Sequence, residues 1–186
     1  MRSRTILLLA TVLATCGCSS NKLIVNHDPA ADFSRYRTYG FVQKLGTDSK
    51  EYGTLLSEYL KAAATRELQA RGYEPSDDPD LLVNFYVHTK DKVESTMTPS
   101  MYYGYRGYVA WGGYLGYQET VTEYTEGTLN VDIVEAMRNQ LVWEATLIGR
   151  VTDKVRENLE EAANQAISEM FEKYPYRAGR QATQSE

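Results

Sequence analysis

Apolar residues along the chain follow two periods, and each period predicts a different kind of element. Two segments repeat apolar residues at i, i+3, i+4 and i+7, which is the stripe of an amphipathic α-helix. The first starts at Tyr52 and ends before Gly72, and the second runs from Val155 to Tyr174 and ends at Pro175. Glycine just after the last turn and proline beyond it are both helix stop signals. The pattern therefore predicts two helices.

Other segments form short apolar runs or alternate apolar with polar residues, as strands do. Strands are expected over residues 23–25, 38–42, 81–87, 129–133 and 141–147, with 121–124 leading into the fourth. The last two strands form a hairpin around a turn at 135–139. In the second arm of this hairpin, Trp143 shares one face with Leu141, Ala145 and Leu147. We expect that face to pack under the second helix.

The elements follow the order β-β-α-β-β-β-α, and this order decides the fold class. Two helices with one apolar stripe each must bury those stripes against one sheet. We therefore expect an α+β fold, with a mainly antiparallel sheet of about five strands and two amphipathic helices packed on one face. A Rossmann-like sheet would need regular βα alternation and a glycine-rich turn after a strand, and the sequence has neither.

The N-terminus carries the signals of an exported lipoprotein. Arg2 and Arg4 precede the apolar run 6–14, which is too short to span a bilayer and fits a signal peptide. The cysteines that follow resemble the lipobox of bacterial lipoproteins, in which the cysteine at the cleavage site is acylated. Cys18 follows a glycine, as that pattern prefers, and Cys16 is the alternative. An ordinary secretory signal cut near residue 14 is the other interpretation.

The lipobox divides the chain and predicts its location. Residues 1–17 form the signal peptide, 18–22 the lipidated N-terminus and a short tether, 23–176 a single domain, and 177–186 a polar tail. Ser19 stands where enteric lipoproteins retained in the inner membrane carry aspartate. We therefore expect a lipid-anchored protein in the periplasmic leaflet of the outer membrane, and retention in the inner membrane stays open.

Residues 99–118 are rich in tyrosine and glycine and follow neither period. Six Tyr, one Trp and five Gly occur between Tyr102 and Tyr117. One interpretation is a mobile insertion between two strands, because glycine raises the entropic cost of ordering a backbone. The other is a contact surface for glycan, lipid headgroup or another protein, since Tyr and Trp combine large apolar area with one polar group. The candidate contact residues are Tyr102, Tyr103, Tyr105, Tyr108, Trp111, Tyr114 and Tyr117.

The rest of the sequence offers little for catalysis, metal binding or nucleic-acid binding. The formal net charge is −5, which argues against nucleic acid as a partner because phosphate binding needs clustered Lys and Arg. The two histidines, His27 and His88, are isolated, so no metal site and no cofactor are expected. Neighbouring carboxylates occur at 77–78 and 160–161, where solvated side chains are expected. For Arg35 and Arg37, ion pairs within the fold and contacts with anionic headgroups are the alternatives.

Four motifs resemble a known family when they are taken together. They are residues 32–39, 80–85, 124–129 and 139–143, and they are similar in type and order to the domain-of-unknown-function family 4136. The resemblance covers about residues 22–176. It implies a bacterial envelope lipoprotein, mostly of Gram-negative organisms, and transfers no catalytic residue. Glu144 departs from the pattern, which leads us to expect a basic residue after the tryptophan.

These observations predict a membrane-anchored envelope lipoprotein with a non-catalytic binding or scaffolding role. Its expected partners are the membrane, through the acyl chains, and an envelope protein or glycan. A periplasmic binding module for a small or lipidic ligand is the first alternative, and it requires an apolar pocket. A hydrolase is the second, and it requires carboxylates converging in a cleft.

Overall fold

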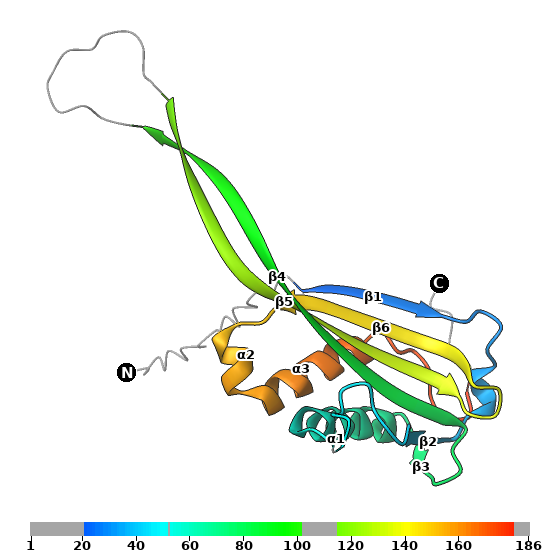
Figure 1. The fold of residues 1–186 in the computed structure, drawn as a ribbon. Helices are drawn as coiled ribbons and strands as arrows, with labels where there is room; N and C mark the ends of the chain where they lie inside the picture. The colour runs from blue at the N-terminus through cyan, green and yellow to red at the C-terminus, as the bar shows by residue number, and fades with distance from the viewer. Residues whose placement is uncertain (1–20, 52, 102–114, 181–186) are drawn as a thin grey trace, which may run out of the picture.

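The computed structural model describes residues 21–51, 53–101 and 115–180 of the chain, and it shows an α+β fold (Figure 1). A six-stranded sheet is combined with three α-helices and one 3-10 turn in these residues. The elements in chain order are β1 (Lys22–His27), η1 (Phe33–Arg35), β2 (Thr38–Phe41), α1 (Leu55–Ala70), β3 (Glu74–Pro75), β4 (Leu81–Met101), β5 (Leu115–Glu135), β6 (Gln140–Arg150), α2 (Asp153–Glu157) and α3 (Leu159–Phe171).

The sheet is mixed, although its main part is antiparallel as predicted. The strand order is β1-β6-β5-β4-β2-β3, and β1, β6, β5 and β4 pair antiparallel. In contrast, β2 runs parallel to both β4 and β3. A parallel pair needs a crossover connection, and here α1 supplies it between β2 and β4. The expectation of about five strands therefore misses one, the two-residue β3.

The helices cover one face of the sheet, as Figure 1 shows, and the core lies between the two layers. Strand residues at alternate positions point into it, among them Val83, Phe85 and Ile133, which are fully buried. Aromatic side chains fill the space under α3. Trp143 lies 5.1 Å from Tyr174 and 5.7 Å from Phe171, measured between ring centroids.

Both predicted helices form, but the first starts at a different residue from the predicted one, and the second is divided into two helices. The first begins at Leu55 rather than Tyr52, because Thr54 acts as N-cap and its Oγ1 accepts from the Ser57 amide at 3.1 Å. It ends at Ala70, and Gly72 follows with a φ of 86°, the left-handed conformation that this helix stop requires. The second predicted helix is broken at Asn158 into α2 and α3, so the structure has three helices instead of two.

The hairpin of β5 and β6 follows the prediction except at one residue. Trp143 is 1% exposed and lies on the helix-facing side with Ala145 and Leu147, as expected. Leu141 was assigned to the same face but is 38% exposed. The register shifts between Ile133 and Val134, which inserts Val142 as an extra, buried residue. A bulge of this kind reverses the alternation on its far side.

Strands β4 and β5 are much longer than the predicted strands. They pair without interruption from Leu81–Glu135 to Met101–Leu115, so strand pairing continues into both ends of the segment 99–118. The C-terminal segment is also ordered by backbone contacts up to residue 180. The Gly179 amide donates to the Tyr36 carbonyl at 2.8 Å, and the Ala178 amide donates to the Arg71 carbonyl at 3.1 Å.

Candidate functional site

The outer halves of β4 and β5 project from the domain as a two-stranded arm (Figure 1). The third strand, β6, ends at Arg150 opposite Glu126, and beyond this pair β4 and β5 have no strand partner other than each other. We define the arm as residues 91–101 and 115–125. At about 3.3 Å per residue it is roughly 35 Å long. Residues 102–114, which contain most of the tyrosines and glycines of the segment 99–118, connect its two strands.

One face of the arm carries an exposed apolar stripe formed by Val93, Met97 and Val121. Val121 lies opposite Ser95, so it is the diagonal neighbour of both Val93 and Met97 across the two strands. The exposed fractions are 67% for Val93, 67% for Met97 and 58% for Val121. No other described element covers these side chains. Two carboxylates, Glu119 and Glu123, lie on the same face and flank the stripe.

The opposite face of the arm is polar. It carries Glu94 paired with Thr122, Thr96 paired with Thr120, and Thr98 paired with Gln118. Side chains alternate between the two faces of a strand, so one face is polar throughout, and the other alternates the three apolar residues of the stripe with Glu119, Glu123 and Ser95. Three neighbouring apolar side chains that are each more than half exposed form a small apolar patch, and patches of this kind can mark contact surfaces.

Ion pairs fix the base of the arm to the sheet. Lys92 bonds Glu126 at 2.7 Å, and Arg150 at the end of β6 forms an ion pair with Glu94. The Arg150 guanidinium also lies 4.2 Å from the Tyr124 ring centroid. The hydrogen bond from Lys92 to Glu126 raises the pKa of the lysine above its ordinary value. These contacts restrict the orientation of the arm relative to the sheet at the point where β6 ends.

Most of the residues that the sequence singled out lie outside the described residues. These are Cys16, Cys18, Tyr102, Tyr103, Tyr105, Tyr108, Trp111 and Tyr114. Tyr117 belongs to β5, where it pairs with Pro99 near the end of the arm. The structure therefore places the two ends of the Tyr/Gly segment at the end of the arm, roughly 35 Å from the sheet.

A row of polar residues crosses the sheet face that no described helix covers. Asn84, Asp132, Glu144 and Asn26 lie opposite one another on β4, β5, β6 and β1. Asn26 Nδ2 donates to Glu144 Oε1 at 2.8 Å. Partial burial and the nearby Glu144 carboxylate raise the pKa of Asp132. Glu144, the residue that departs from the family pattern, thus lies opposite another carboxylate.

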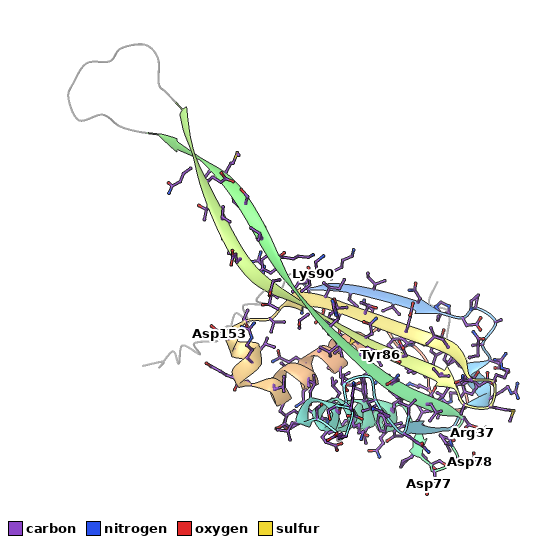
Figure 2. All side chains as sticks on the ribbon, viewed as in Figure 1. Arg37, Asp77, Asp78, Tyr86, Lys90 and Asp153 are labelled. Carbon is purple, nitrogen blue, oxygen red and sulfur yellow. The ribbon has the colours of Figure 1, made fainter. Side chains whose placement is uncertain are left out.

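The candidate arginines lie at the end of the sheet opposite the arm, together with a buried carboxylate. Figure 2 shows Arg37 at this end, and Lys90 at the base of the arm. Glu135 is 6% exposed, accepts from Tyr36 Oη at 2.9 Å and forms an ion pair with Arg138. Burial and this carboxylate raise the pKa of Tyr36 to about 12. The described ion pairs include neither Arg35 nor Arg37, so the predicted partners of these two side chains are not observed there.

No cluster of three metal-ligating side chains occurs in the described part of the chain. His27 is exposed and contacts Tyr176 edge to face, with 6.3 Å between ring centroids, and His88 is exposed on β4. Asp77 and Asp78 lie in the loop before β4 (Figure 2), and Glu160 and Glu161 lie in the first turn of α3. These carboxylates do not converge.

Two open grooves are present on the described surface. One, of about 550 Å³, lies between α1 and the β2 edge. Its polar lining residues are Thr65, Gln69, Ser76 and Asp77, and the others are mainly apolar. The other, of about 450 Å³, lies between the start of α1 and the α2–α3 junction, where Glu157 and Glu161 face it. Neither is the enclosed apolar pocket that a small-ligand module requires.

In residues 21–51, 53–101 and 115–180, no helix combines the length and the apolarity needed to cross a bilayer. Three of the described helices are α-helices, and the longest of them is α1, with 16 residues.

Comparison with known proteins identifies the family of the chain. A crystal structure of a PDZ domain protein from Parabacteroides distasonis matches 87% of this chain at 18% identity with a TM-score of 0.56, and the match spans 37% of that longer protein. The PelC dodecamer from Paraburkholderia phytofirmans matches 87% of this chain and 99% of its own at 13% identity, with a TM-score of 0.46. No curated protein matches. The family model for Domain of unknown function (DUF4136) matches residues 24–176, and the chain belongs to this family.

Proposed function

We propose that this protein is a membrane-anchored envelope lipoprotein with a non-catalytic binding or scaffolding role. In this proposal Cys18 carries the acyl chains in the periplasmic leaflet of the outer membrane, and the aromatic residues between 102 and 117 form the contact surface for an envelope protein or glycan. The lipobox-like N-terminus supports the anchor.

The arm is the observation that carries the binding role. Its two strands separate the Tyr/Gly segment from the core by roughly 35 Å, and ion pairs at Glu94 and Glu126 fix its base. The side chains of Val93 and Met97 are each 67% exposed and do not belong to the core of the domain. A long extension whose outer side chains lie outside the core, and that leads to a segment rich in Tyr and Trp, is suited to presenting that segment to a partner.

The two alternatives have less support. A small-ligand module would bind in an apolar pocket between helices and sheet, but that space is filled by Trp143, Phe171 and other core side chains. The groove beside α1 is open and partly polar. A hydrolase would need converging carboxylates, and the described pairs at 77–78 and 160–161 do not converge.

Site-specific photocrosslinking in the producing cells tests the proposal. A photoreactive amino acid is placed at Tyr108 or Trp111, and the matched control carries it at Met137, which is 90% exposed at the other end of the sheet. We expect a discrete crosslinked band from positions 108 and 111 and none from 137. Equal crosslinking at all three positions, or none at 108 and 111, would contradict a contact surface in the Tyr/Gly segment.

A further inference from the structure

The proposed anchor and the base of the arm lie at the same end of the sheet. β1 begins at Lys22, which pairs with Ile148 of β6, and Ile148 also pairs with Thr128 of β5. This row is two residues from Glu126–Arg150, the pair at which β6 ends and the arm begins. From Cys18 to Lys22 the chain spans four residues, at most about 14 Å. An acyl chain on Cys18 therefore holds the base of the arm close to a bilayer.

This attachment point restricts how the molecule sits on the membrane. The helices and the core lie on one side of the base, and the arm lies on the other (Figure 1). The arm, at roughly 35 Å, is more than twice the tether length. Tilting the arm far from the bilayer would press the opposite end of the domain, with Arg37, Asp77 and Asp78, into the lipid. Burying such charged groups in hydrocarbon is unfavourable. The orientations that avoid it keep the arm near the membrane surface.

The arm exposes apolar side chains that suit contact with a membrane surface. Val93, Met97 and Val121 form one diagonal stripe, and each is more than half exposed. An isolated two-stranded ribbon is marginally stable in water and gains stability when its apolar face is covered. The stripe is continuous with the end of the sheet that the tether holds near lipid.

The carboxylates on the same face limit how deeply the arm can enter a bilayer and exclude charge attraction as the force that holds it there. Glu119 and Glu123 flank Val121. Lys92 is the one cation among residues 91–101 and 115–125, and it is already paired with Glu126, whereas Lys90, Arg150 and Arg156 lie at the base of the arm. Two charged carboxylates are costly in hydrocarbon but remain hydrated at headgroup level. The arm would therefore lie in the interface and not cross the bilayer, and attraction to anionic lipid would not hold it there.

We propose that the lipid bilayer carrying the anchor is also the docking surface of the arm, which contacts it through Val93, Met97 and Val121. This inference rests on the proposed lipid anchor at Cys18. It adds a second attachment to that anchor, on a face of the arm that is separate from the Tyr/Gly segment.

Fluorescence quenching on the mature lipoprotein tests the inference. The full mature chain is reconstituted in phosphatidylethanolamine–phosphatidylglycerol vesicles, with an environment-sensitive dye on single cysteines introduced as Met97→Cys or Val121→Cys. The matched controls are Thr96→Cys, on the polar face of the arm, and Met137→Cys, at the far end of the domain. We expect a nitroxide near the lipid headgroup to quench the dye at 97 and 121 several-fold more than at 96 and 137. Quenching should not change with salt.

The outcomes separate this inference from the proposed anchor. Flotation with the vesicles, together with the mass of the N-terminal peptide, reports acylation of Cys18 independently of the arm. A protein that floats but shows equal quenching at positions 97 and 137 overturns the docking of the arm and leaves the anchor intact. A chain that is not acylated overturns both. Equal quenching at 96 and 97, loss of quenching in salt, or a dye shift that depends on protein concentration and not on lipid would each overturn docking through the apolar stripe.

Discussion

At the scale of single residues, Trp143 links the hairpin to the helices. Its side chain is 1% exposed and contacts Phe171 and Tyr174 of the segment that covers the sheet. We expect Trp143→Ala to lower the free energy of unfolding by about 3–5 kcal/mol, as large-to-small changes in a core do. Urea denaturation of the chain from residue 19 onward measures the loss.

Trp143→Phe is the matched control for this substitution. The Trp143 Nε1 is buried without a hydrogen-bond partner among the described residues, so the phenylalanine loses volume but no hydrogen bond. It should cost clearly less than alanine. A loss below about 1 kcal/mol for Trp143→Ala would contradict its place in the core.

The facing carboxylates Asp132 and Glu144 predict a pH-dependent stability difference. The pKa of Asp132 is raised in the folded protein, by partial burial and then by Glu144. The folded state therefore binds this proton more tightly than the unfolded state does. The resulting destabilisation is present above the folded pKa and disappears as the pH falls below the unfolded value of about 3.9.

We accordingly expect Asp132→Asn to stabilise the protein at pH 7 by roughly 0.5–1 kcal/mol, the scale of a cross-strand pair. The advantage over the parent should shrink near pH 4, because the parent carboxyl is then becoming protonated. Comparing variant with parent at each pH cancels other titrating groups such as Asp48 and Glu135, whose pKa values are lowered. Glu144→Gln should act in the same direction, since its amide oxygen still accepts from Asn26. A destabilised Asp132→Asn at pH 7 would contradict the repulsion.

At the scale of elements, the arm is separable from the fold. Its exposed stripe contributes no buried area to the core, so joining Lys90 to Glu126 through a short Asn-Gly turn should leave the domain folded. A shorter connection also has a slightly smaller entropic cost of loop closure. We expect the free energy of unfolding to change by less than about 1 kcal/mol, measured by urea denaturation with circular dichroism. Loss of the folded baseline would show that the arm stabilises the sheet.

At the scale of the whole molecule, two features combine at one end of the sheet. The tether predicted from Cys18 enters β1 there, and β4 and β5 leave the sheet there as the arm. The other end carries the buried Glu135 with Tyr36 and Arg138. The fold therefore has two distinct ends, and the proposed anchor, the arm and the Tyr/Gly segment all belong to one of them.

The sequence by itself determined those elements whose side chains are buried on one face. The stripe of the first helix, the alternation of Val131 and Ile133, and the inward face of Trp143 follow from it, because burial imposes a period of 3.6 or 2. The Gly72 stop follows from backbone conformation, which is also local. The family was identified at the same level, since its four motifs lie in one order along the chain.

Only the tertiary structure decided features that depend on pairing between distant residues or lack buried faces. The register that opposes Asp132 to Glu144, the bulge that exposes Leu141 and the parallel edge strand β2 all depend on long-range pairing. In the arm, residues 93–98 and 118–123 are exposed on both faces, so no burial period marks these parts of its strands, and the sequence predicts no strand over residues 91–101. Burial leaves a period in the sequence, whereas strand register leaves none, and neither does a pair of strands with no buried face.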